Sequence, residues 1–181
     1  MCIRDRPYSK VPDFKAELDQ RDGVAARALA FTVLTAARSG ETREMCWAEV
    51  DLENRIWTIP ADRMKSAKEH RVPLSDDALA LIGEARRGSA LVFESDTKHG
   101  RPISNMSMTA VLRRMKLDAV TVHGFRSSFR DWAGETTHFP TEVIEAALAH
   151  RLKDKAEAAY ARSDLFEKRR DLMNAWAVFI N

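Results

Sequence analysis

The sequence has few cysteines, no long apolar run and no signal peptide, and each shortage excludes a class of protein. Cys2 and Cys46 are the only cysteines among 181 residues, which excludes a disulfide-rich secreted scaffold. The most apolar stretch, residues 28–37, includes two threonines and has about half of the ~20 residues that a membrane-spanning helix needs. The N-terminus lacks the apolar segment of a signal peptide. We therefore expect a soluble, cytoplasmic protein without a membrane partner.

The chain also has almost no net charge. Its 29 Lys and Arg residues nearly balance 27 Asp and Glu residues, which leaves a formal charge of +2. That excess is too small to indicate nucleic-acid binding, so the local distribution of basic residues must decide. Hydrophobic residues make up 45% and charged residues 31% of the chain, a composition that favours one folded domain with a solvated surface.

The first residues differ from the rest of the chain. The segment Met1 to Asp5 is similar to the translation of a transposon end used in sequencing libraries, and the alternative is a native but irregular terminus. Pro7 and Pro12 are typical of a linker. We therefore divide the chain into residues 1–12, a non-native or linker segment, and a domain of residues 13–181. If the first residues are not native, the chain is the C-terminal part of a longer protein.

The hydrophobic pattern predicts a mainly α-helical domain with a small antiparallel sheet. Residues 24–37 are apolar around the whole helix and predict a buried central helix. Residues 55–59 and 70–74 predict two strands joined by a basic hairpin loop, 61–69. A turn is expected at 51–54 and a short strand at 91–93. Further helices are expected at 13–21 and 41–45, after Ser75 and Ser104, around 125–133, and from Thr141, Asp154 and Asp164 onward.

Six residues stand out as candidates for chemistry, although each also has an ordinary structural explanation. They are Arg38, Lys65, His123, Arg126, His150 and Tyr160. An arginine that leaves an apolar helix needs a partner, and Glu41, three residues after Arg38, can hold its guanidinium. The spacing of three places His123 and Arg126 on one side of a helix start, where phosphate binds well. Tyr160 is surrounded by alanines, which leaves its phenol free to reach a substrate.

In their order and sequence context, these six residues resemble the tyrosine recombinase (phage integrase) family. The motifs that carry the resemblance are TAARSGE around Arg38, RVPL after Lys65, HGFR from His123 to Arg126, LAH ending at His150 and AAY ending at Tyr160. Residues 163–170 resemble the integrases of prophages and bacterial genomic islands. The resemblance covers residues 11–181, and we find no departure from the family pattern at the six positions.

The resemblance implies a fold, partners and a reaction. Residues 13–181 correspond to the catalytic domain, and the N-terminal core-binding domain of the family is absent from the sequence. The implied partners are double-stranded DNA and other integrase protomers, four of which act together on DNA in the family. The resemblance also implies a bacterial, cytoplasmic protein that associates with DNA. Because one phosphoester bond replaces another throughout the reaction, the resemblance implies no cofactor, metal or ATP.

The resemblance also implies a role for each residue. Tyr160 attacks the scissile phosphorus and forms a 3′-phosphotyrosine with a free 5′-hydroxyl, as in covalent catalysis generally. Arg38 and Arg126 bind the non-bridging oxygens, and His150 donates a further hydrogen bond there. His123 accepts the phenolic proton and Lys65 protonates the departing 5′-oxygen. Glu41 orients without reacting.

Basic residues outside this set cluster along the chain, so a near-neutral total can hide a positive face. We expect DNA contacts from Arg63, Lys68, Arg71, Lys98, Arg101, Arg113, Arg114 and Lys153. The five histidines lack the short spacing of metal ligands, and we expect no metal site.

Three alternatives remain open at this point. A metal-free nuclease or phosphodiesterase would use His123, His150 and Lys65 with water as the nucleophile. A type IB topoisomerase would share the covalent step without exchanging strands, and a non-catalytic fragment would only bind DNA. The end of the chain is also open, because Trp176, Phe179 and Ile180 either seal the domain's own core or dock on a neighbouring protomer.

Overall fold

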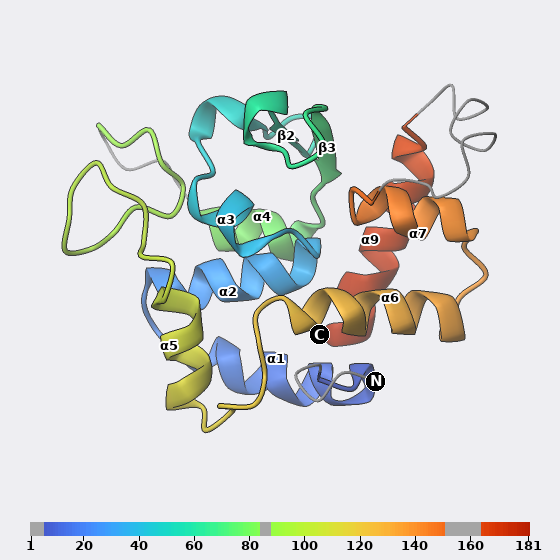
Figure 1. The fold of residues 1–181 in the computed structure, drawn as a ribbon, viewed down its shortest axis with the longest axis horizontal. Helices are drawn as coiled ribbons and strands as arrows, with labels where there is room; N and C mark the ends of the chain where they lie inside the picture. The colour runs from blue at the N-terminus through green and yellow to red at the C-terminus, as the bar shows by residue number, and fades with distance from the viewer. Residues whose placement is uncertain (1–5, 84–87, 151–163) are drawn as a thin grey trace.

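The computed structural model describes residues 6–83, 88–150 and 164–181. The described part is mainly helical with a small antiparallel sheet, which confirms the predicted fold class (Figure 1). Its helices are α1 (Val11–Asp19), α2 (Val24–Thr35), α3 (Ser39–Arg43), α4 (Asp76–Ile82), α5 (Ser107–Arg114), α6 (Gly124–Thr136), α7 (Thr141–Ala147) and α9 (Phe166–Ile180). Short 3₁₀ helices are η1 (Tyr8–Lys10), η2 (Trp47–Glu49) and η3 (Ala61–Arg63), and the strands are β1 (Val50–Asp51), β2 (Ile56–Ile59) and β3 (His70–Pro73).

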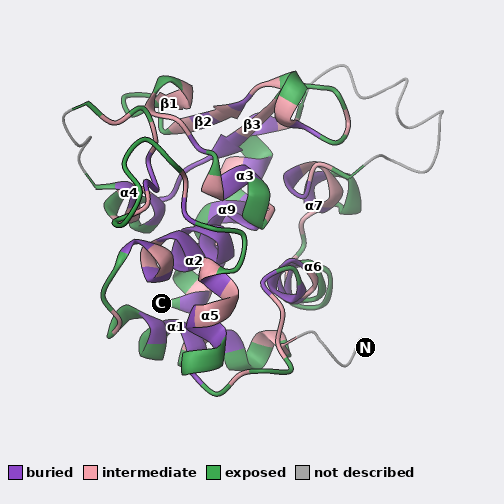
Figure 2. Ribbon diagram, turned by 60° about the vertical axis from the view of Figure 1, so that its left-hand side comes forward, coloured by how far each residue is buried: buried purple, intermediate pink, exposed green. Residues whose placement is uncertain are grey.

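Helix α2 is the central element, as its sequence predicts. It packs against α1, α3, α4, α5 and α9, and nearly all of its residues are buried (Figure 2). The hydroxyls of Thr32 and Thr35 are satisfied in the core because each donates to a carbonyl one turn back, at 2.7 Å. The helix ends at Thr35, two residues earlier than predicted, because Ala36 has the left-handed conformation with φ 49°.

The sheet has the order β1-β2-β3, with antiparallel pairing throughout. Trp57 and Ile59 of β2 are fully buried and alternate with more exposed neighbours, as the period of two predicts. The two expected strands are therefore confirmed. Strand β1 was not predicted, because it has two residues and exists only through the pairing of Val50 with Trp57 and Asp51 with Ile56.

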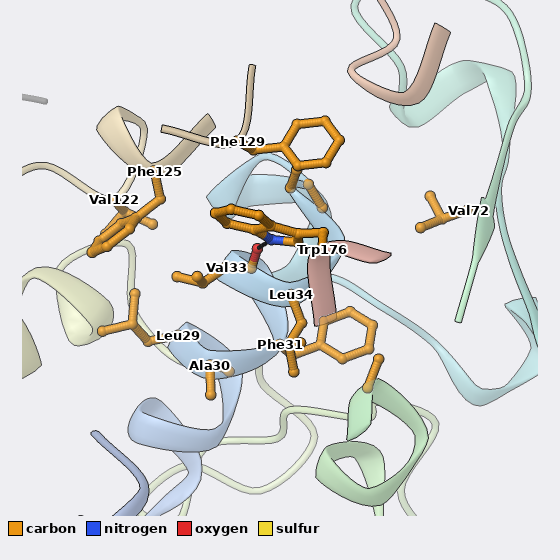
Figure 3. Close-up of a cluster of buried hydrophobic side chains, with 14 of the residues drawn as sticks. Leu29, Ala30, Phe31, Val33, Leu34, Val72, Val122, Phe125, Phe129 and Trp176 are labelled. Carbon is orange, nitrogen blue, oxygen red and sulfur yellow. Dashed lines mark hydrogen bonds between the residues drawn. The ribbon is translucent and has the colours of Figure 1, made fainter. Parts of the chain in front are cut away.

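Helix α9 closes the core with an aromatic cluster. The Trp176 ring lies 5.0 Å from that of Trp132 and 5.5 Å from that of Phe129, and its indole N–H donates to the Val33 carbonyl at 2.9 Å (Figure 3). Trp176 and Ile180 are buried. The C-terminal helix thus packs into the domain's own core, the first of the two alternatives.

Several element boundaries differ from the predictions. Helix α1 begins at Val11 because Pro12 is tolerated in the first turn of a helix, and Val11 is fully buried. Helix α5 begins three residues after Ser104. The segment 91–93 forms one isolated bridge, between Leu91 and Cys46, instead of a strand. The helix expected from Asp154 lies outside the described residues.

Ion pairs and hydrogen bonds connect the start of α9 to β3. The sequence predicted instead that Asp164 caps this helix. The Arg169 side chain is 1% exposed and donates to the Asp164 carbonyl at 2.7 Å and the Arg71 carbonyl at 2.6 Å. Arg71 makes two hydrogen bonds of 2.8 Å to the Asp164 carboxylate, and its guanidinium lies 4.4 Å from the Phe166 ring centre. Asp164 therefore joins two elements instead of capping one.

His70, the first residue of β3, lies beside these charges. Burial lowers its pKa to about 4, and the positive charges of Arg169, Arg126 and Arg38 act in the same direction, against a hydrogen bond to the Ala147 backbone. The imidazole is therefore neutral at pH 7 in the folded protein.

We predict that Trp176→Ala lowers the free energy of unfolding by about 3–5 kcal/mol, because it removes a large buried side chain and leaves a cavity. Urea denaturation followed by circular dichroism measures this change. Val178→Ala is the control, since Val178 is on the same helix but 81% exposed, and it should change stability by no more than about 0.5 kcal/mol. Equal effects of the two substitutions would contradict the packing described.

We predict that stability falls as the pH drops from about 6.5 towards 4, in part through His70. In this window the unfolded chain binds a proton at His70 and the folded chain does not, so acid favours unfolding. His70→Gln should remove on the order of 2–3 kcal/mol of this dependence. Urea denaturation at a series of pH values measures it, with His138→Gln, at an exposed histidine, as the control. An unchanged profile in His70→Gln would refute the prediction.

Candidate active site

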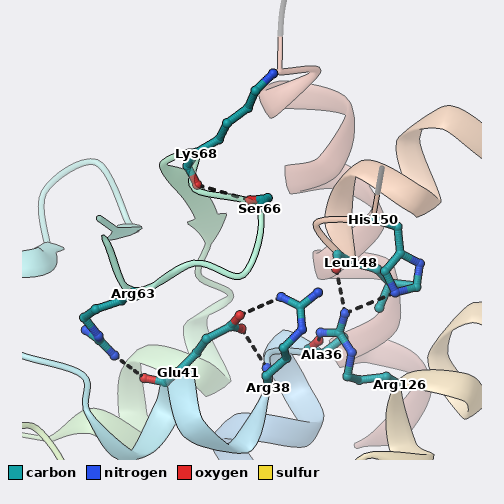
Figure 4. A network of polar contacts seen from close by, with 9 residues as sticks. All are labelled: Ala36, Arg38, Glu41, Arg63, Ser66, Lys68, Arg126, Leu148 and His150. Atoms are coloured by element: carbon teal, nitrogen blue, oxygen red, sulfur yellow. Dashed lines mark hydrogen bonds and ion pairs between the residues drawn. The ribbon is translucent and has the colours of Figure 1, made fainter. Parts of the chain in front are cut away.

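Arg38 lies at the junction between α2 and α3, where the chain turns after the left-handed Ala36. Its Nη1 donates to Glu41 Oε1 at 2.6 Å and its backbone N–H donates to Glu41 Oε2 at 2.8 Å. Glu41 is 7% exposed, so its carboxylate is held firmly. The contact expected from the spacing of three residues is present, and it fixes the Arg38 guanidinium at the start of α3 (Figure 4).

Arg126 lies in the first turn of α6 and is buried instead of exposed at the surface. Its Nη1 donates to the Ala36 carbonyl, and its Nη2 donates to the Leu148 carbonyl at 2.6 Å (Figure 4). One side chain thereby connects α6 with the ends of α2 and α7. Burial and the nearby positive charge of Arg38 lower the Arg126 pKa to about 10, partly offset by Glu41. Arg126 remains charged at neutral pH.

His150 follows α7 and faces Arg126. Its Nε2 lies 3.5 Å from Arg126 Nη2, and its Nδ1 lies 2.7 Å from Glu145 Oε2. Glu145 also accepts a 2.6 Å hydrogen bond from Arg130 Nε. Burial opposes ionisation of Glu145, but the hydrogen bonds from Arg130 and His150 outweigh it and hold its pKa below the ordinary value.

Glu145 and Arg130 were missed by the sequence analysis. Glu145 precedes His150 by five residues, a spacing that becomes a contact only because the chain turns after α7. The backbone N–H of His150 donates to the Glu145 carbonyl at 2.9 Å, and the intervening Ala149 has the left-handed conformation with φ 50°. The Glu145 carboxylate is therefore a candidate orienting group for the His150 ring.

Lys65 shares a pocket with Arg38. The pocket has a volume of about 280 Å³ and is lined by Arg38, Gly40, Glu41, Glu44, Arg63 and Lys65. The loop between β2 and β3 thus brings Lys65 to the same place as α3. Lys68, another lysine of this loop, extends away from Arg38 and Arg126 (Figure 4).

The structure describes His123 but not the predicted nucleophile. His123 is exposed and precedes α6, and its carbonyl accepts from the Arg126 N–H at 3.0 Å. Tyr160 and Lys153 lie outside the described residues. Of the six candidates, Arg126 lies beside Arg38 and His150. Lys65 lines a pocket with Arg38, and His123 lies one turn from Arg126.

The expected DNA contacts fall into two groups. Exposed side chains are those of Lys68, Lys98, Arg101, Arg113 and Arg114. Arg63 and Arg71 instead form ion pairs with Glu49 and Asp164. The loop that carries Lys98 and Arg101 lies near the same end of α2 as helix α5, which carries Arg113 and Arg114 (Figure 1).

The described residues hold neither a candidate metal-ion cluster nor a helix that could span a membrane. Within residues 6–83, 88–150 and 164–181, no three or more His, Cys, Asp and Glu side chains are grouped so that they could hold a metal ion. None of the helices in this part of the chain is long and apolar enough to cross a membrane.

Comparison with known proteins shows the family of this chain. The model of the phage integrase family matches residues 11–165. The chain is 42% identical to prophage integrase IntA of Escherichia coli K12 over 80% of this chain and 36% of that protein. It is 33% identical to the integrase of Enterobacteria phage P4 over 97% of this chain and 45% of that protein. The chain thus spans less than half the length of either relative.

The fold also matches a solved structure, that of a lambda integrase (75–356) dimer bound to a COC′ core site. The TM-score is 0.60 at 16% identity, and the match covers 88% of this chain and 59% of the other. At this identity the likeness concerns the fold. The family match over residues 11–165 establishes that the chain belongs to the phage integrase family, the tyrosine recombinases.

Proposed function

We propose that this chain is the DNA-cleaving part of a site-specific recombinase that cuts and rejoins double-stranded DNA through Tyr160. The observation that carries the proposal is the meeting of Arg38, Arg126 and His150 at the junction of α2, α6 and α7. Two guanidiniums held side by side repel each other, and that repulsion contributes to the lowered Arg126 pKa. An anion bound between them relieves the repulsion, and a phosphodiester is such an anion.

The chemistry has to overcome a weak nucleophile and a highly charged transition state. A phenol with a pKa near 10 is ionised in about one molecule in a thousand at pH 7. In the proposed reaction the Tyr160 oxygen bonds to phosphorus while the bond from phosphorus to the 5′-oxygen breaks. Arg38 and Arg126 stabilise the charge on the non-bridging oxygens, and His150 donates a third hydrogen bond.

Proton transfer is the remaining requirement. His123 accepts the phenolic proton and Lys65 gives a proton to the leaving 5′-oxygen, each contributing about 10²–10⁴ in rate. The pocket shared by Lys65 and Arg38 supports this role for Lys65. Attack by the 5′-hydroxyl of another strand reverses the step and rejoins the DNA. One phosphoester bond replaces another in each step, so the proposed reaction needs no ATP. Arg38 and Arg126 supply the positive charge at the phosphate, so it requires no metal.

The proposal extends to the partners. The lambda integrase match is a dimer bound to a core site, and we propose that this protein likewise binds double-stranded DNA together with further copies. The exposed basic residues on the loop 88–106 and at the end of α5 support a DNA-binding surface, with phosphate contacts from Lys98, Arg101, Arg113 and Arg114. Lys68 on the β2–β3 loop is a further proposed contact.

We predict that the chain forms a covalent adduct with a nicked half-site duplex, from which the cleaved end diffuses away. The adduct is measured as a slower band after denaturing electrophoresis. Tyr160→Phe should abolish it without loss of DNA binding, because only the nucleophile is removed. Arg126→Lys should slow its formation by about 10²–10³-fold, the usual cost of one lost donor to a developing charge.

Tyr8→Phe is the matched control, since Tyr8 is the other tyrosine of the chain and packs near Phe179; it should keep the adduct. Cleavage without an adduct would favour a nuclease that uses water. An adduct that persists in Tyr160→Phe would refute the assigned nucleophile. DNA binding without cleavage would favour a non-catalytic module.

We predict that DNA binding weakens steeply with salt, with log K falling by about 0.9 per log unit of salt for each neutralised phosphate. The double variant Arg113→Gln/Arg114→Gln should flatten the slope by up to about 1.8, since each guanidinium releases counterions from one phosphate. Fluorescence anisotropy at several salt concentrations measures the slope. Lys10→Gln, at an exposed lysine on η1, is the control. Binding that does not depend on salt would contradict the prediction.

A further inference from the structure

A network of largely buried charges lies beneath the β2–β3 loop and takes no part in the chemistry described so far. Its centre is Arg63, whose side chain is only 17% exposed although its sequence position predicts a DNA contact. Arg63 Nη1 forms an ion pair with Glu49, and Nη2 donates to the Glu41 carbonyl at 2.7 Å (Figure 4). Both ends of the guanidinium are therefore engaged inside the protein.

Glu49 is held in place by a different part of the fold. Its Oε2 accepts from Trp57 Nε1 at 2.9 Å and from the Cys46 backbone N–H at 3.3 Å, while Oε1 faces Arg63. Trp57 is fully buried in β2, so its indole N–H is a fixed donor. Moving Arg63 onto a DNA phosphate would leave the Glu49 carboxylate, 12% exposed, without its cation, which is strongly unfavourable.

The position of Arg63 links two groups of the candidate active site. It lies two residues before Lys65, and it holds the backbone of Glu41, whose carboxylate fixes Arg38. Arg63, Glu41, Arg38 and Lys65 all line the same pocket of about 280 Å³. The guanidinium thus fastens the start of the loop that carries Lys65 to the helix that anchors Arg38.

We propose that Arg63 and Glu49 are positioning residues that set the distance between Lys65 and the phosphate held by Arg38. The proposal rests on the proposed function, in which Lys65 protonates the leaving oxygen. Arg38 keeps its own two bonds to Glu41 without Arg63, so loss of the ion pair affects mainly Lys65. A displacement of about 1 Å at a reacting group can cost 10²-fold in rate.

A change of leaving group tests this directly. In a half-site with sulfur in place of the bridging 5′-oxygen at the scissile phosphate, the leaving group is a thiolate, which needs no proton because its pKa is far lower than that of an alcohol. Arg63→Met and Glu49→Gln should each slow adduct formation about 10–100-fold on the ordinary substrate. The sulfur substrate should restore most of that rate, as it should for Lys65→Ala. DNA affinity and its salt slope should not change.

Three controls separate positioning from unfolding. Thermal unfolding shows whether each variant is folded at the assay temperature. Arg63→Lys keeps the charge, but one ammonium cannot replace the fork that reaches both Glu49 and the Glu41 carbonyl, so it should fold and still show the rescuable defect. Asp76→Asn breaks a matched exposed ion pair with Arg55, at 2.6 Å, and should leave cleavage unchanged.

The opposite results would overturn the proposal. A DNA contact at Arg63 would lower affinity in Arg63→Met, flatten the salt slope by about 0.9 and resist rescue by sulfur. A normal rate in Glu49→Gln would also refute it. If the unsubstituted chain forms no Tyr160 adduct on either substrate, the proposed function itself fails, which distinguishes that outcome from a failure confined to Arg63.

Discussion

The buried guanidinium of Arg126 is the contact on which the arrangement of this domain depends. Helix ends leave backbone carbonyls without partners, and two such carbonyls, those of Ala36 and Leu148, meet at Arg126. A neutral side chain could not satisfy both as strongly, because hydrogen bonds from a charged donor are the stronger kind. The residue that completes the core is therefore also the one that brings the end of α2 next to the end of α7.

This arrangement places two positive charges close together at a largely buried position, which is unfavourable without an anion. Arg38 lies beside Arg126, and Glu41 compensates only part of their combined charge. The strain of two like charges is tolerated because each guanidinium has rigid protein acceptors. In the proposed reaction, such a preorganised pair is suited to a phosphate whose charge increases in the transition state.

Arginines for which the sequence predicts one role have different environments in this fold. Arg63, Arg71, Arg113 and Arg114 were all expected to contact DNA, yet the first two form ion pairs with Glu49 and Asp164, and the last two are exposed. The partner of Arg71 lies 93 residues away in sequence. No local pattern indicates such a partner, because the packing of α9 on β3 creates the contact.

The sequence by itself determined the helical class, the central helix, the hairpin and the family, because these depend on hydrophobic period and on motif order. It also predicted the contact between Arg38 and Glu41, which is local in the chain. Only the tertiary structure decided that Arg126 is buried, that Glu145 supports His150, and that Arg63 faces inward. Burial of a charge depends on which distant groups surround it, and neither spacing nor composition carries that information.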